Sequence, residues 1–175
     1  ETEIDLSGVP VRAGDGARLA QALALCRKIE ELTWNFVPMP AEEVSAMLVA
    51  PVPSLRKLYL QESGLGEAGG VALAAAIGKG ATPQLQKLVL DDNALGKRGA
   101  KALAAAITKE ALPSLTELCL QRTGLGAAGR RLLDEAAKAR GDGLQVVHAQ
   151  DEPDDDDGEP DDDDGLNAAQ GLSLI

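Results

Sequence analysis

One stretch decides the fold: Leu85-Gln-Lys-Leu88-Val-Leu90-Asp-Asp-Asn93-Ala-Leu95-Gly96. The same spacing of leucines occurs 30 residues earlier, from Leu55 to Gly66, and 30 residues later, from Leu115 to Gly126. A segment of small residues follows each copy and carries one leucine at a fixed position: Leu73, Leu103 and Leu133. Self-similarity at a fixed period of this length indicates stacked units, each of which buries its apolar face against its neighbours.

The pattern extends towards the N-terminus with less regular spacing. At 26 residues before the copy that starts at Leu55, the matching positions are Ile29, Leu32, Trp34, Met39 and Met47. Further back, Ile4, Leu6 and Leu19 occupy three of the same positions. The spacing therefore predicts five units of one strand and one helix, with a last short strand at residues 141–147. Alternating leucines bury one face of a strand, and alanine-rich segments such as 71–77 form helices with little bulk.

This pattern resembles the leucine-rich repeat family, in particular its ribonuclease-inhibitor-type repeat, in which a strand L-x-x-L-x-L-x-x-N/C-x-L precedes a full helix. The resemblance covers residues 4–147. It implies an α/β fold, a leucine-rich-repeat solenoid with a curved parallel sheet on its concave side and helices on its convex side. The family's Asn after the strand is kept only at Asn93, because Ser63 and Thr123 replace it in the neighbouring copies. The ladder of side chains along this turn is therefore expected to have gaps.

Charge divides the chain into two parts. Of 28 acidic and 17 basic residues, 17 of each lie within residues 1–150, while 11 acidic residues and no basic one lie within 151–164. We expect a leucine-rich repeat domain at residues 1–148 and a disordered acidic tail with an apolar end at residues 149–175, because like charges repel and the acidic run has no apolar residue to bury. A body without basic excess gains little from counterion release, which argues against direct binding of nucleic acid.

Composition favours a reducing compartment. No apolar run reaches the roughly 18 residues that a membrane-spanning helix needs, so no membrane insertion is expected. The two cysteines, Cys26 and Cys119, lie 93 positions apart, unlike the dense spacing of secreted disulfide-rich domains. We expect an intracellular protein, cytoplasmic or nuclear. The first strand, residues 3–7, begins almost at residue 1, which indicates either a piece of a longer array or an edge that a partner covers.

Three features that resemble chemical sites are interpreted as structural. The segment 64–69 and its copy 60 residues later match the dinucleotide fingerprint G-x-G-x-x-G, but they recur in phase with the repeat and are typical of a loop that turns from strand into helix. His148 is the only histidine and is expected at the surface past the last strand, remote from a catalytic partner or a His/Cys metal site. Cys26 shares a helical face with Leu19 and Leu23 and is expected in the core. We therefore predict that the protein is not an enzyme and uses no metal or cofactor.

The candidate binding surface is the concave face, built from strand residues that alternate with the buried leucines. Its outward positions form three rows along the stacked strands. Tyr59 lies near the centre, and aromatic side chains surrounded by polar ones are typical of interface cores, whereas Trp34 occupies a leucine position and is expected in the core. The candidate partner-binding residues are Lys57, Tyr59, Gln61, Lys87, Val89, Asp91, Glu117, Cys119 and Gln121. The alternative is that these are only solvated strand residues.

These features favour a non-enzymatic protein-protein interaction module, a small scaffold or adaptor subunit of a multisubunit assembly that binds its protein partner through the concave face. Two alternatives rest on layout alone. A solenoid of this repeat type before an acidic segment is similar to the Ran GTPase-activating protein, whose activity resides in repeat loops that the segment from Asn93 to Gly96 resembles. A leucine-rich domain before an acidic tail is also similar to acidic nuclear phosphoproteins, whose tails bind histones.

Overall fold

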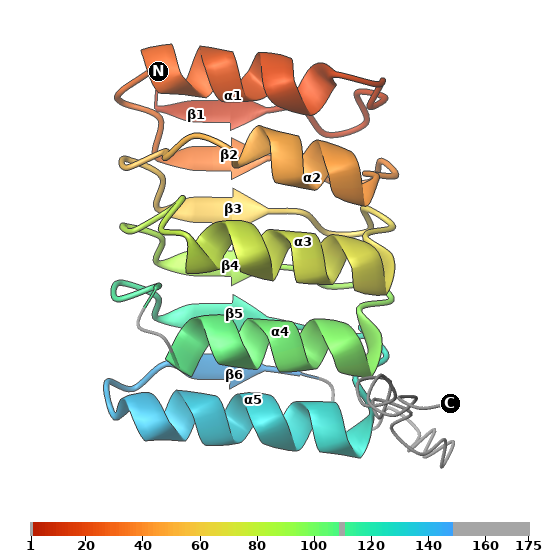
Figure 1. The fold of residues 1–175 in the computed structure, drawn as a ribbon, viewed down its shortest axis with the longest axis vertical. Helices are drawn as coiled ribbons and strands as arrows, with labels where there is room; N and C mark the ends of the chain where they lie inside the picture. The colour runs from red at the N-terminus through yellow and green to blue at the C-terminus, as the bar shows by residue number, and fades with distance from the viewer. Residues whose placement is uncertain (1, 109–110, 149–175) are drawn as a thin grey trace, which may run out of the picture.

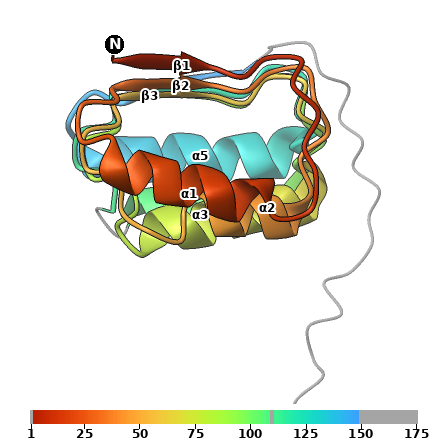
Figure 2. The ribbon, with the colours of Figure 1, turned by 90° about the horizontal axis from the view of Figure 1, so that it is seen from above.

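The computed structural model describes residues 2–108 and 111–148, which form a layer of strands and a layer of helices (Figures 1 and 2). Strands and helices alternate along the chain, as the α/β solenoid prediction requires. The strands are β1 (Glu3–Asp5), β2 (Glu31–Thr33), β3 (Lys57–Tyr59), β4 (Lys87–Val89), β5 (Glu117–Cys119) and β6 (Gln145–Val147). The helices are α1 (Asp15–Leu25), α2 (Ala41–Met47), α3 (Gly66–Gly78), α4 (Gly96–Thr108) and α5 (Gly126–Arg140).

The sheet stacks the strands in chain order, and every neighbouring pair is parallel. The register aligns the central residues of the strands, so one row of apolar side chains points from the sheet towards the helices. This row contains Ile4, Leu32, Leu58, Leu88, Leu118 and Val146. Leu32, Leu58 and Leu88 have no exposed surface at all. The five predicted units and the last short strand are confirmed.

The loop that follows each strand turns the chain into the next helix. In the third repeat Gly66 has a φ of 60°, a left-handed conformation that a side chain adopts only with strain. The same position is Gly96 and Gly126 in the next two repeats, with φ of 60° and 63°. The first two glycines of the G-x-G-x-x-G pattern are therefore explained by this turn, while the third lies within the helix.

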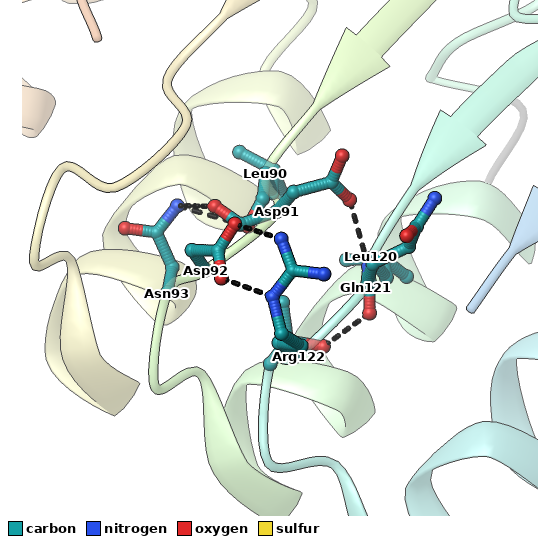
Figure 3. A network of polar contacts seen from close by, with 8 residues as sticks. Leu90, Asp91, Asp92, Asn93, Leu120, Gln121 and Arg122 are labelled. Carbon is teal, nitrogen blue, oxygen red and sulfur yellow. Dashed lines mark hydrogen bonds and ion pairs between the residues drawn. The ribbon is translucent and has the colours of Figure 1, made fainter. Parts of the chain in front are cut away.

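Asn93 holds the turn after β4, and its side chain is fully buried (Figure 3). Its Nδ2 donates to the carbonyl of Leu60 in the preceding repeat at 2.7 Å and to that of Leu90 in its own repeat at 2.9 Å. Its Oδ1 accepts from the backbone N–H groups of Ser63 and Leu65, both at 3.1 Å. One amide therefore satisfies buried backbone groups of two repeats, which water cannot reach.

Hydroxyl groups take the equivalent place in the neighbouring repeats. Ser63 Oγ donates to the carbonyl of Trp34 in the preceding repeat at 2.9 Å, and Thr123 Oγ1 donates to that of Leu120 at 2.6 Å. Both side chains are fully buried. The hydroxyl of Ser63 therefore bridges two repeats with a single bond, where Asn93 bonds to several backbone groups.

Glu43 of α2 holds the start of α1, although only 7% of its surface is exposed. Its Oε1 accepts from Gly14 N–H and its Oε2 accepts from Gly16 N–H, both at 2.8 Å. The N-cap residue of α1 is Gly14, which has no side chain to cap the helix. A carboxylate from the next helix therefore satisfies these N–H groups at the positive end of the α1 dipole. A Cβ at Gly16 would lie 2.3 Å from the Glu43 carbonyl oxygen, so this approach of two helices requires glycine.

Two expectations about the ends of elements have a different outcome. Cys26 is exposed, so its predicted place in the core is wrong. The reason is that α1 ends at Leu25, and the helical spacing that linked Cys26 to Leu23 does not extend past that residue. The acidic tail predicted at residues 149–175 lies outside the described residues.

Replacing Asn93 tests the role of its amide. We expect Asn93→Ala to lower the free energy of unfolding by about 3–5 kcal/mol, because several buried backbone groups lose a hydrogen-bond partner. Asn93→Asp should lower it by a similar amount, since a carboxylate cannot donate to the carbonyls of Leu60 and Leu90. Urea unfolding measures both. Asn35→Ala is the matched control with an expected loss of about 1 kcal/mol, because Asn35 accepts one bond from Gln61 N–H at 2.8 Å. Equal losses for Asn93→Ala and Asn35→Ala would contradict this account.

Replacing Glu43 tests the cap between helices. We expect Glu43→Ala to lower the free energy of unfolding by about 1–3 kcal/mol, because two N–H groups at the start of α1 lose their acceptor. The neighbouring exposed Glu42 provides the control, and Glu42→Ala should change stability by less than about 0.5 kcal/mol. Hydrogen exchange should locate the loss of protection in α1. A loss of protection spread evenly over all repeats would show that the cap is not local.

Candidate protein-interaction face

One face of the sheet points away from the helices. Each strand contributes its first and third residues to this face, and β1 to β5 also contribute the residue two positions after the third. We call this surface the strand face. Its first row contains Glu3, Glu31, Lys57, Lys87, Glu117 and Gln145, and its second row contains Asp5, Thr33, Tyr59, Val89, Cys119 and Val147. Its third row contains Ser7, Asn35, Gln61, Asp91 and Gln121.

The first row carries an ordered pattern of charge. Lys57 and Lys87 lie directly opposite each other on adjacent strands, and each turns to an acid on its other side. Lys57 Nζ lies 3.0 Å from Glu31 Oε2, and Lys87 Nζ lies 2.8 Å from Glu117 Oε1. The hydrogen bond to Glu31 raises the pKa of Lys57, and the bond between Lys87 and Glu117 raises the pKa of the lysine and lowers that of the acid. The row therefore presents two central positive charges between two negative ones.

The second row is an apolar strip across four neighbouring strands. It consists of Tyr59, Val89, Cys119 and Val147, which follow one another from β3 to β6. Tyr59 and Val147 are half-buried at the two ends of the strip. Val89 and Cys119 between them are only 6% and 8% exposed. Most of the apolar surface that a partner can touch therefore belongs to Tyr59 and Val147.

The thiol of Cys119 is held in an environment that disfavours its charged form. Burial raises its pKa to about 12, and the neighbouring carboxylate of Glu117 acts in the same direction. Cys119 Sγ donates a hydrogen bond to Glu117 Oε1 at 3.3 Å. A thiol with this pKa is a poor nucleophile at neutral pH, so Cys119 is a packing residue of the strip.

The third row serves the backbone of the next repeat. Asp91 Oδ1 accepts from Gln121 N–H at 2.7 Å, as Asn35 does from Gln61 N–H (Figure 3). Burial raises the pKa of Asp91, and the adjacent carboxylate of Asp92 contributes. These side-chain bonds add to backbone hydrogen bonds that continue past the three-residue strands, such as the bond from Glu62 N–H to the carbonyl of Asp91. The third-row side chains form a polar border of the strand face, and part of their hydrogen-bonding capacity is already used.

An ion pair lies beside this border. Arg122 donates from Nε to Asp92 Oδ1 and from Nη2 to Asp92 Oδ2, the second bond at 2.6 Å (Figure 3). This pair lowers the pKa of Asp92 and raises that of Arg122. Both residues have positive φ, 59° and 53°, and so do Phe36 and Glu62 at the same position of earlier repeats. The left-handed residue after the third row is therefore a regular feature of the turn.

All nine residues predicted from the sequence lie on the strand face, over β3, β4, β5 and the turns after them. The prediction overestimated the exposure of Val89 and Cys119, which pack against their neighbours along the row. It missed Val147, which pairs with Cys119 in the register of the last strand. The predicted last strand already included this residue, so extending the second row by one strand would have found it. Trp34 is confirmed as a core residue, 3% exposed, with its Nε1 donating to the carbonyl of Val9 at 3.0 Å.

Over residues 2–108 and 111–148, no group of three or more His, Cys, Asp or Glu side chains is arranged to hold a metal ion. In the same part of the chain, no helix combines the length and the apolar character needed to cross a bilayer. His148, half-buried after β6, lies with its Nε2 3.0 Å from Asp134 Oδ1 of α5.

Comparisons with known proteins agree with this architecture. A family model described as Leucine Rich repeat matches residues 83–104, which include Asn93. Among 36 matching chains of solved structures is one titled "Leiomodin-1 Actin-Binding Site 2 (ABS2)", with a TM-score of 0.62, 14% identity and 81% of each chain covered. The comparison with curated protein sequences found no match. Residues 83–104 thus match the leucine-rich repeat model, and the likeness at 14% identity shows that the chain shares the fold of that structure and no more.

The two cysteines should differ sharply in reactivity. At about pH 8 a thiol reagent should modify the exposed Cys26 of the native protein quickly, while Cys119 reacts only after denaturation, because burial and a pKa of about 12 keep its thiol neutral. Counting modified thiols by mass spectrometry before and after adding guanidinium measures this. Cys26→Ser is the control, and its native form should take up no label. Equal labelling rates for both cysteines in the native protein would disprove the burial of Cys119.

Proposed function

We propose that residues 1–148 of this leucine-rich-repeat solenoid form a non-enzymatic interaction module, a scaffold or adaptor subunit that binds a protein partner through the strand face. The observation that carries this proposal is the apolar strip from Tyr59 to Val147, bordered on one side by the charged first row and on the other by the polar third row. An apolar centre with a polar rim is the usual composition of a protein-protein interface.

The shape of the molecule supports a macromolecular partner. Three cavities in the described residues, of about 270, 370 and 300 Å³, lie between helices or beside β6, and none of their lining residues belongs to the three rows. The strand face is instead an extended surface. Each strand contributes one side chain to each of its first two rows. Repeat solenoids present such surfaces to protein partners.

The charges of the first row specify what the partner should present. Because adjacent strands are about 4.8 Å apart, Lys57 and Lys87 form a pair of positive charges that fits two neighbouring carboxylates. Glu31 and Glu117 on either side favour basic groups at the edges of the same partner segment. This pattern contributes specificity and orientation, while the partly exposed ring of Tyr59 is the anchor expected to contribute most affinity.

Actin is the first defined partner to test, because the structure with a similar fold is titled an actin-binding site. The GTPase-activating alternative has no support from Asn93, whose side chain is fully buried and bonded to the backbone of two repeats. The histone-binding alternative depends on residues 151–164, which lie outside the described part of the chain. Neither alternative is favoured by a specific contact.

Tyr59→Ala tests the strand face. The full chain, immobilised, is used to capture partners from native extract and, in parallel, purified actin, at low and high salt. We expect a stoichiometric partner that resists high salt, and we expect Tyr59→Ala to weaken its binding at least about tenfold, equivalent to about 1.4 kcal/mol, because the anchor of the apolar strip is removed. Binding is then measured with the purified partner by calorimetry.

Val49→Ala is the matched control, since Val49 is 75% exposed on a loop between the helix layer and the next strand. It should leave the affinity unchanged. Circular dichroism and urea unfolding establish that Tyr59→Ala remains folded. If Tyr59→Ala and Val49→Ala bind equally well, the strand face is not the interface. If only basic proteins are captured, and all are lost at high salt, the acidic segment is responsible.

A further inference from the structure

Basic side chains collect on the outer surface of the last two helices. Arg98 and Lys101 of α4 and Arg131 of α5 are exposed, and we call these three residues the basic helix patch. Lys101 and Arg131 are 30 residues apart and therefore occupy the same position of successive repeats, on helices that lie side by side (Figure 1).

The fold does not neutralise this patch. In the part of the chain that the structure describes, no ion pair joins Arg98, Lys101 or Arg131 to an acid. The nearby acids of the neighbouring elements have other contacts: Glu67 Oε1 accepts from the backbone N–H of Arg98 at 3.3 Å, and Asp134 pairs with His148. Glu135 is the remaining acid of α5, exposed one turn after Arg131.

The position of the patch along the helices is electrostatically unfavourable. The first turns of α1, α2 and α3 contain acidic residues, whereas those of α4 and α5 contain none. Arg98 lies in the first turn of α4, where the helix dipole favours negative charge. At the start of α4 the only nearby carboxylate that the described contacts place is Glu67 of α3, which accepts from Arg98 N–H. A further negative group over this end of the helices would be attracted by the exposed basic side chains and, at α4, by the dipole.

The chain carries a suitable negative group close to this place. The strands end at the edge of the molecule where the helices begin (Figure 1), so β6 leads the chain towards the first turns of α4 and α5. His148 directly follows β6 and contacts Asp134, which lies one turn after Arg131. The run of 11 acidic residues starts at Asp151, three residues further on. Three extended residues span about 10 Å, so the acidic segment begins within about 10 Å of His148.

We propose that the acidic segment 151–164 binds the basic helix patch of its own chain. Charge complementarity supports this occupant, and the short connection from His148 gives it an effective concentration in the millimolar range that an acidic segment of another protein would have to exceed. Residues 151–164 then cover the outer surface of α4 and α5, and a basic partner of the segment must compete with Arg98, Lys101 and Arg131. This inference does not depend on the proposed role of the strand face.

Paramagnetic relaxation in the full chain tests the proposal. A nitroxide is attached at Gly158→Cys in a Cys26→Ser background, where the buried Cys119 stays unlabelled. At about 0.02 M salt we expect the label to broaden backbone amide signals of α4 and α5 and to leave those of α1 and α2 sharp. At about 0.5 M salt the broadening should largely disappear, because exposed charges are then screened within a few Å.

Lys101→Glu/Arg131→Glu should abolish the broadening at low salt. The matched control is Arg27→Glu/Lys28→Glu, which reverses two exposed charges on the loop after α1 and should leave the broadening unchanged. Equal broadening in the two double variants would overturn the proposal. So would a lack of broadening at low salt in the nitroxide-labelled chain that keeps Lys101 and Arg131. A mixture of isotope-labelled chains without nitroxide and unlabelled chains with nitroxide provides the last check, since broadening there would show binding between copies instead of within one chain.

Discussion

Stacking of one leucine row on the next is the constraint on which this structure depends. Each strand has only three residues, although backbone hydrogen bonds between repeats continue past its end, from Leu60 N–H to the carbonyl of Val89 and from Glu62 N–H to that of Asp91. The fully buried leucines at the strand centres and the buried polar groups of the turns add to this ladder. Asn93 joins two repeats through five backbone groups. At the C-terminal end Arg140 bonds to the preceding repeat, where its Nη1 donates to the carbonyl of Leu112 at 2.8 Å.

This constraint divides the outward side chains into two groups. The third row is partly committed to the fold, because Asn35 and Asp91 accept backbone hydrogen bonds from the following repeat. The first two rows are not needed for such bonds, so their residues can vary between positive, negative, aromatic and aliphatic without breaking the stack. Recognition by a repeat solenoid is therefore concentrated in positions next to the leucines that build it, and the fold alone does not reveal the partner.

The repeat made the architecture predictable, but it did not predict the contacts between repeats. Fixed spacing locates each strand, each helix and the direction of Leu58, Leu88 and Leu118. It does not show that Glu43 reaches the start of α1, because the two are joined through an irregular loop and 27 to 29 residues separate the bonded groups. It also placed Cys26 on a helix that ends one residue earlier, and it could not show how far neighbouring rows cover Val89. Those properties depend on loop lengths and on side chains from adjacent repeats.

Equal numbers of acids and bases in residues 1–150 conceal an uneven distribution along the solenoid. Acidic residues occupy the first turns of α1 to α3, where Glu43 and Glu67 accept from backbone N–H groups of neighbouring helices. At the other end, the first turns of α4 and α5 contain no acid of their own, Glu67 of α3 is the acid that accepts from Arg98 N–H, and the two helices carry Arg98, Lys101 and Arg131. A neutral body with this distribution has a positive end, and the acidic segment follows the last strand at that same end. The net charge of −11 is therefore a poor guide to the field that a partner meets at α4 and α5.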